Sequence, residues 1–190
     1  RIINGSAMTF FNLRIPGLPM TVIAADGQNV RPVEVDEFQI GTAETYDVIV
    51  EPRAEEAYAI VAESMDRSGM ALAMLASRPG VRAPIPALRP PPLLDMGDMG
   101  MNHGDMGGDH GAGHSMEGMA MRDTALLPPD VEVGPGIDMV AMAPVDKLGD
   151  PGLGLRDVGH RVLNYRMLSA LEPNRDTREP SRLLELHLTG

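Results

Sequence analysis

The chain has 190 residues, no cysteine and a formal net charge of −11 at pH 7. This acidic balance argues against a nucleic-acid partner, since such proteins need clustered Lys and Arg, and the lack of cysteine excludes disulfides and thiolate metal sites. The sequence contains no apolar run long enough for a membrane-spanning helix. It starts at Arg1 rather than Met and ends at Gly190 directly after an apolar run. We therefore expect both ends to be internal to a longer protein.

The first 80 residues predict an all-β fold. Short apolar runs recur at a spacing of roughly ten residues and are separated by Gly, Pro and Asp, the pattern of an antiparallel β-sandwich. The expected strands are 8–15, 20–25, 30–35, 46–50, 57–62 and 71–77. The continuous apolar run 20–25 predicts burial on both faces, and Pro32 predicts an edge strand. Because six to eight strands close such a core, we expect partner strands upstream of Arg1.

The rest of the chain is expected to be mostly irregular. Residues 81–94 are rich in proline and predict a stiff linker into residues 95–123. Residues 124–180 are expected to be an irregular linker with a short helical turn at 165–171. In residues 181–190, leucines alternate with polar side chains and predict the first strand of a further domain.

Residues 95–123 have a composition unlike that of any packed element. They hold seven of the 15 methionines, three of the five histidines and eight glycines, with no aromatic residue. Each glycine would cost a helix about 1 kcal/mol relative to alanine, so we expect a loop without regular structure. The order is nearly mirrored, because Met-x-x-Met-x-Met-x-His precedes the centre and His-x-Met-x-x-Met-x-Met follows it.

The donors in residues 95–123 favour copper. Thioether sulfur is a soft ligand that suits Cu(I), and imidazole binds Cu(II) as well. Zinc is a weaker interpretation because C-x-x-C and H-x-x-x-H spacings are lacking, and a simple spacer is the remaining alternative. The candidate metal ligands are Met96, Met99, Met101, His103, Met106, His110, His114, Met116, Met119 and Met121.

Outside residues 95–123, we expect structural roles for the two remaining histidines, for Glu44 and for most of the methionines considered. His160 and His187 are predicted to be ordinary surface histidines, and Glu44 is predicted to hydrogen-bond at a corner of the sandwich. Packing is the expected role of three methionines: Met65, Met70 and Met74. For Met139 and Met142, which have M-x-x-M spacing among apolar neighbours, packing and copper binding both stay open.

Parts of the sequence resemble a known family. Residues 3–52 (INGSAMTFF to YDVIVEP) resemble the second half of the middle cupredoxin domain of a multicopper oxidase. Three further stretches resemble the copper-resistance protein A branch of that family: residues 95–123 (from here on the Met/His segment), DPGLGLRDVGHRVLNY (150–165) and SRLLELHLTG (181–190). The resemblance implies a partial cupredoxin-like Greek-key β-sandwich for residues 1–80.

The resemblance also implies a function. Members of this family are periplasmic enzymes of three cupredoxin domains. They oxidise Cu(I) or phenolic substrates at a mononuclear copper and reduce dioxygen to water at a trinuclear cluster. His-x-His pairs and a His-Cys-His stretch in the first and third domains bind these coppers, and this chain contains neither motif. We therefore expect the parent protein to be an oxidase, with the first and third domains as partners, and this chain alone to be inactive. The alternative is a non-catalytic periplasmic module that sequesters or delivers copper.

Overall fold

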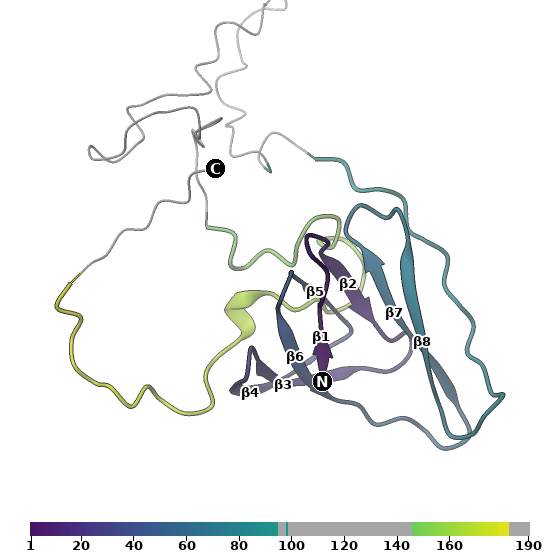
Figure 1. Cartoon of the computed structure of the whole chain (residues 1–190), viewed down its shortest axis with the longest axis horizontal. Coiled ribbons are helices and arrows are strands. Elements are labelled where there is room, and N and C mark those ends of the chain that lie inside the picture. The colour runs from purple at the N-terminus through teal and green to yellow at the C-terminus, as the bar shows by residue number, and fades with distance from the viewer. Residues whose placement is uncertain (95–97, 99–145, 183–190) are drawn as a thin grey trace, which may run out of the picture. The chain divides into compact units, whose positions relative to one another are not determined.

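Two antiparallel four-stranded sheets pack face to face in the computed structural model, which describes residues 1–94, 98 and 146–182 (Figure 1). One sheet has the order β1-β6-β3-β4 and the other β5-β2-β7-β8. Their bounds are β1 (Ile2–Ile3), β2 (Phe11–Arg14), β3 (Met20–Ala25), β4 (Gln28–Val35), β5 (Glu37–Ile40), β6 (Thr45–Ile49), β7 (Ala57–Ser64) and β8 (Met70–Ala76). The described ranges contain two antiparallel sheets and no α-helix, so the prediction of an all-β antiparallel sandwich is confirmed.

Six of the eight strands coincide with the expected runs, and two were missed. Strand β1 has only two residues, too few for a pattern, and β5 is the four-residue sequence EFQI. In β5 a charged residue and an amide alternate with Phe38 and Ile40, and the preceding strand continues almost directly into it. The apolar signal was therefore too short to separate β5 from its surroundings.

The hydrophobic core lies between the two sheets. Met20, Val22, Val35 and Phe38 are fully buried there, and the rings of Phe38 and Tyr46 lie 4.9 Å apart between centroids at 47°. Burying one such large apolar side chain stabilises the fold by about 1.5–3 kcal/mol. The apolar side chains that point between the two sheets make up most of the apolar runs expected from the sequence.

Strand β3 corrects one prediction. Its burial alternates, with Met20, Val22 and Ala24 buried and the residues between them only half-buried. The expectation that both faces of β3 are buried is therefore wrong, because the outer face of this sheet has no complete covering layer. Strand β4 is the last strand of its sheet, as Pro32 predicted.

Residues 147–175 were expected within a linker, yet they group with residues 1–93 as one compact unit. They contribute two deeply buried side chains, Leu155 and Leu163, which are 1% and 5% exposed. Residues 161–163 run parallel to the free edge of β5, and Ala170 bridges Val30 at the free edge of β4. The irregular segment therefore covers an edge strand of each sheet, a common protection against edge-to-edge association.

The expected helical turn near residue 165 is a single 3-10 turn, η4 (Tyr165–Met167). It lies between the part of the segment that pairs with β5 and the part that pairs with β4. Met167 and Leu168 pack against the core from this position.

Two segments distant in sequence meet at Gly154. A Cβ added to Gly154 would lie 2.9 Å from the Cβ of Pro92, so the proline-rich segment and residues 147–175 contact each other directly. Gly154 also has a φ of +70°, which favours glycine. Pro92 and Gly154 therefore lie next to each other within the compact unit.

Several predictions lie outside the described residues. These are the loop of residues 95–123 apart from Asp98, the strand at 184–188, and the roles of Met139, Met142 and His187. No helix within residues 1–94 or 146–182 is long and apolar enough to cross a membrane.

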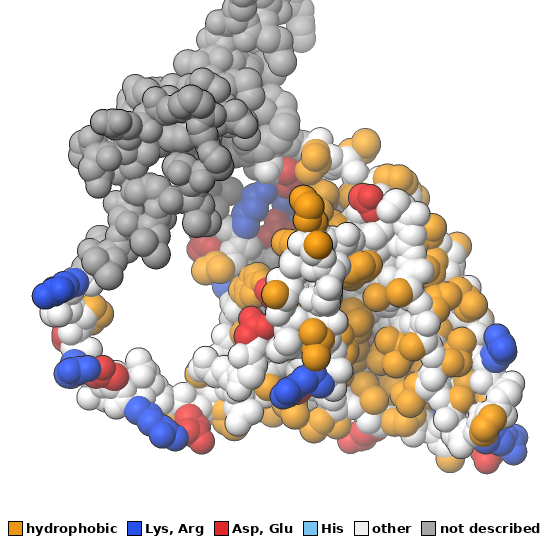
Figure 2. All heavy atoms as spheres, in the orientation of Figure 1, with side chains coloured by type: hydrophobic (Ala, Val, Ile, Leu, Met, Phe, Trp, Pro, Cys, Tyr) orange, Lys and Arg blue, Asp and Glu red, His pale blue; other side chains and the backbone are white. Residues whose placement is uncertain are grey.

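The surface of the sandwich mixes charged and apolar side chains. On the face shown in Figure 2, hydrophobic side chains gather in the region of β7 and β8. Leu72 and Met74 on β8 are 42% and 37% exposed, and the Met74 sulfur accepts a hydrogen bond from the Ala83 N–H at 3.4 Å. The proline-rich segment thus runs beside the edge strand β8.

Replacing Gly154 with alanine tests the contact between the two segments. Gly159→Ala is the matched control, because Gly159 has a similar φ of +76° but nothing within 4 Å of an added Cβ. The control is expected to cost about 1–2 kcal/mol of unfolding free energy from backbone strain alone. Gly154→Ala is expected to cost about 1–3 kcal/mol more, because the methyl group must displace Pro92. Urea unfolding measures both values, and equal losses would contradict the contact.

Candidate functional site

All ten predicted metal ligands lie outside the described residues. Within residues 1–94, 98 and 146–182, no group of three or more His, Cys, Asp or Glu side chains is arranged to hold a metal ion. The described sandwich therefore offers no such group to a metal ion. The chemistry-bearing residues that it brings together are instead a buried ion cluster and a tyrosine pocket.

The outer face of the β5-β2-β7 sheet carries a buried layer of polar side chains. The register places Asn12 between Gln39 and Glu63, and Arg14 between Glu37 and Val61. Side chains alternate along a strand, so the neighbours Leu13 and Phe38 face the hydrophobic core. The polar layer is inaccessible to solvent at Asn12, Glu37 and Glu63, each 0% exposed, because the proline-rich segment and residues 147–163 cover it.

Arg89, from the proline-rich segment, bridges the two buried carboxylates. Its Nη2 lies 2.5 Å from Glu37 Oε1 and 2.6 Å from Glu63 Oε2, and its Nε donates to Glu63 Oε2 at 2.7 Å. Its backbone N–H donates to Glu63 Oε1 at 2.9 Å. One arginine therefore joins β5, β7 and the segment that precedes residue 95.

A second arginine completes the cluster. The Arg67 guanidinium, with a side chain only 1% exposed, forms an ion pair with Glu63, and its Nη2 donates to the Gly154 carbonyl at 3.4 Å. Two carboxylates and two guanidiniums thus balance in charge. Such balance is needed because an unpaired buried charge is strongly unfavourable.

His160 joins this cluster from residues 147–175. Its Nε2 lies 2.7 Å from Glu37 Oε2, and its side chain is 29% exposed. The prediction that His160 is an ordinary surface histidine is therefore wrong: the ring contacts a carboxylate that the sequence did not indicate as buried. The Glu37 carboxylate thus contacts Arg89 from the proline-rich segment and His160 from residues 147–175.

The cluster keeps Glu63 ionised. Burial acts to raise the pKa of Glu63, but the hydrogen bonds and positive charge of Arg89, with Arg67, outweigh it and hold the pKa below its ordinary value. Burial acts to lower the pKa of Arg67, and the neighbouring charge of Arg89 lowers it further. The carboxylates thus keep two adjacent cations together.

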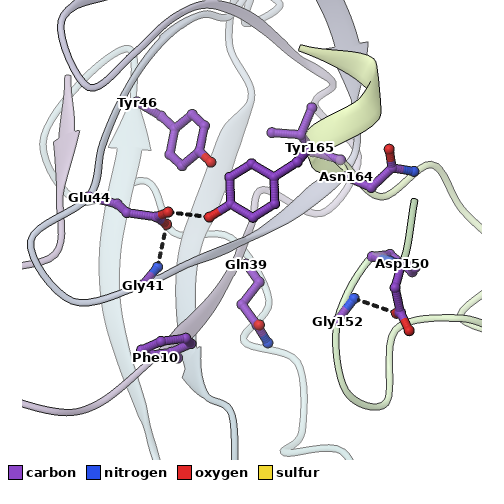
Figure 3. Close-up of a pocket in the computed structure, with 11 residues that line it drawn as sticks. Phe10, Gln39, Gly41, Glu44, Tyr46, Asp150, Gly152, Asn164 and Tyr165 are labelled. Atoms are coloured by element: carbon purple, nitrogen blue, oxygen red, sulfur yellow. Dashed lines mark hydrogen bonds between the residues drawn. The ribbon is translucent and has the colours of Figure 1, made fainter. Parts of the chain in front are cut away.

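A pocket of about 110 Å³ lies where residues 150–165 meet β5 and β6 (Figure 3). Glu44 is central to it, because one carboxylate oxygen accepts from the Gly41 N–H at 2.6 Å and the other accepts from the Tyr165 hydroxyl. Tyr46 lies beside Tyr165, and burial is the main cause that raises the pKa of both, to about 12 for Tyr165. The Tyr165 phenol therefore stays protonated, and its hydrogen bond to Glu44 joins η4 to the Glu44 corner.

Sequence reasoning missed the ion cluster for identifiable reasons. Glu37 sits between Asp36 and Phe38 without apolar periodicity, and Arg89 is one charged residue among prolines. Only the strand register brings Glu37 and Glu63 to either side of β2. The one available signal was a charged residue inside an otherwise apolar strand, such as Glu63 in AYAIVAES.

Residues 1–79 match the family model described as multicopper oxidase. Two similar curated proteins are copper resistance protein A of Escherichia coli, at 47% identity, and a copper resistance protein A homolog of Pseudomonas syringae pv. tomato, at 49%. Both alignments include 100% of this chain, which spans 38% and 36% of the respective relatives.

Among solved structures, that of Fet3p, "a multicopper oxidase that functions in iron import", matches at 19% identity with a TM-score of 0.42. The match covers 46% of this chain and 19% of that one.

Removing the Arg89 charge tests the dependence of the fold on the ion cluster. Arg89→Met keeps a long apolar stem but leaves two buried carboxylates short of a cation, which is expected to cost about 3 kcal/mol of unfolding free energy. Arg82→Met, on an exposed side chain of the same segment, is expected to stay within about 0.5 kcal/mol of the unchanged protein. Urea unfolding at pH 7 compares the two, and a similar effect for both would contradict the bridging role.

Proposed function

Because this chain belongs to the multicopper oxidase family and matches copper resistance protein A over its whole length, we propose that it is part of a copper-dependent oxidase that protects cells from copper. The observation that carries this proposal is the full-length similarity at 47–49% identity, which includes the Met/His segment as well as the sandwich. The chain spans little more than a third of those relatives. The activity is therefore proposed for the whole protein and not for these residues alone.

In this proposal the sandwich is a scaffold. Residues 1–80, with residues 147–175 packed on them, form part of the middle cupredoxin domain, and residues 181–190 begin the next domain. The first and third domains of the same protein supply the catalytic copper ligands. This assignment is supported by the lack of cysteine and of His-x-His in the chain and by the lack of a metal-binding group among the described residues.

Copper supplies the one-electron chemistry when bound in the whole protein. Four Cu(I) ions, or four equivalents of a phenol, each give one electron, and dioxygen takes up these electrons with four protons to become two waters. The contribution of this chain is to present Cu(I), because it lacks the ligands for oxygen reduction.

We assign Cu(I) binding to the Met/His segment. Its seven methionines provide soft thioether donors, and three histidines support either copper oxidation state. The anchored flanks favour this role. Arg89 and Pro92 before the segment, and Gly154 and His160 after it, are all fixed to the sandwich. The chain on either side of the Met/His segment is therefore held on the sandwich, at Pro92 before it and at Gly154 and His160 after it.

The periplasm is the proposed location. A thioether has no proton to lose and forms no disulfide, so it keeps its donor character in an oxidising compartment where cysteine is oxidised. The second candidate is a periplasmic module that sequesters or delivers copper without redox chemistry. It is favoured by the absence of oxidase ligands from all 190 residues.

A competition titration with a Cu(I) chelator tests the metal site. The variant changes Met96, Met99, Met101, Met106, Met116, Met119 and Met121 to leucine. At pH 5, where most imidazoles are protonated because their ordinary pKa is about 6.5, the variant is expected to lose at least about tenfold in Cu(I) affinity.

The matched control changes four methionines of the sandwich, Met8, Met65, Met70 and Met74, to leucine and is expected to leave the affinity unchanged. If the seven-methionine variant binds Cu(I) as tightly as the unchanged protein, the segment is a spacer.

Dioxygen consumption separates the two candidate functions. The purified 190-residue chain, loaded with copper and supplied with Cu(I) or a phenol, is expected to consume oxygen no faster than free copper at the same concentration. A longer protein that includes the flanking domains is expected to consume oxygen faster than free copper, both with Cu(I) and with a phenol. Turnover by the chain alone would contradict the scaffold role, and none by the longer protein would favour the sequestering module.

A further inference from the structure

Arg14 is a cation without a carboxylate partner at the edge of the polar layer. In the strand register it lies opposite Glu37, but both oxygens of Glu37 are occupied by Arg89 and His160. Within the part of the chain that the structure describes, Arg14 forms no ion pair, and its Nε is buried without a hydrogen-bond acceptor. The layer therefore holds two carboxylates and three guanidiniums. Arg14 itself is half-buried, and only its Nε is shielded from solvent. Because a guanidinium cannot lose its proton, this N–H favours an anionic or polar acceptor.

A surface cavity of about 420 Å³ opens beside Arg14. One wall is the turn from β2 to β3, in which the Leu18 N–H donates to the Ile15 carbonyl at 2.9 Å and Gly17 has a φ of +78°. Pro16 and Pro19 stiffen this wall and make it apolar. The cavity thus combines a cationic end with a rigid hydrocarbon surface.

Two further charged or titratable groups, Asp36 and His160, line the cavity. Asp36 is already compensated, because its Oδ2 accepts from the Arg161 backbone N–H at 3.0 Å and from Nε at 3.2 Å. The His160 ring contacts Glu37 through Nε2, and its second nitrogen forms no hydrogen bond within the described residues.

We propose that this cavity is a binding site for a carboxylate group, held by Arg14. A guanidinium presents its donors in a planar fork that matches a carboxylate, and the proline wall accommodates a short alkyl group. A cation is disfavoured by Arg14 itself. This inference does not depend on copper binding or oxidase activity.

The carboxylate has two available sources: a small free acid, or an acidic side chain from the rest of a longer protein. The test titrates the isotope-labelled 190-residue chain with sodium propionate, replacing sodium chloride at constant ionic strength. Amide resonances of Gly17 and Leu18 and the ring resonances of His160 are followed by NMR. Saturable shifts are expected with a dissociation constant on the order of millimolar, since propionate has few atoms with which to bind.

Arg14→Gln is expected to weaken propionate binding by about tenfold or more, because it removes the charge-assisted hydrogen bonds. The control Arg31→Gln, on an exposed arginine of β4, is expected to leave it unchanged. Propionamide, the neutral analogue, is expected to give no saturable shift. It tests the charge requirement even if the Arg14 variant fails to fold.

Shifts no larger with propionate than with chloride, or equal binding by propionamide, would overturn the proposal. If the 190-residue chain binds propionate and a longer protein with the flanking domains does not, the site is filled by an acidic side chain of that protein. If both bind, the ligand is a free acid.

Discussion

The ion cluster around Arg89 is the interaction on which the arrangement of this domain depends. Two carboxylates, Glu37 and Glu63, are fully buried on the outer face of a sheet. They remain charged there because Arg67 and Arg89 supply matching cations within hydrogen-bonding distance. Arg89 belongs to a segment with no regular structure, so the sheet face is complete only when that segment lies on it. The cluster thereby converts a proline-rich stretch into part of the folded domain.

The ion cluster also holds the residues that follow the Met/His segment in the chain. His160 reaches Glu37, the Gly154 carbonyl accepts from Arg67, and Gly154 leaves room for Pro92. These contacts add to the strand-like pairing of residues 161–163 with β5. Polar contacts specify where the returning segment lies, and the buried Leu155 and Leu163 supply its hydrophobic anchoring. Together they cover edges that would otherwise offer unpaired backbone groups.

This arrangement divides the chain into a rigid part and a chemically distinctive part. The described sandwich contains carboxylates and a histidine, but they are used for ion pairing and are not grouped for metal binding. The soft donors are concentrated between Pro92 and Gly154, positions that touch each other. The chain thus joins a sandwich without a grouped set of metal ligands among its described residues to a segment whose copper binding stays a prediction.

Apolar periodicity, proline and local motifs are properties of neighbouring residues. They were therefore enough to predict the all-β class, six of the eight strands, the edge position of β4 and the resemblance to multicopper oxidases. The copper ligands also come from local composition, and they stay a prediction. Tertiary structure alone decided the burial of Glu37, the bridging by Arg89, the role of His160 and the packing of residues 147–175. Each of these depends on contacts between residues far apart in the chain, such as Glu37 and His160. Whether a lone Glu, Arg or His is solvated or paired in a core is set by which segment covers it, and local sequence carries no record of that.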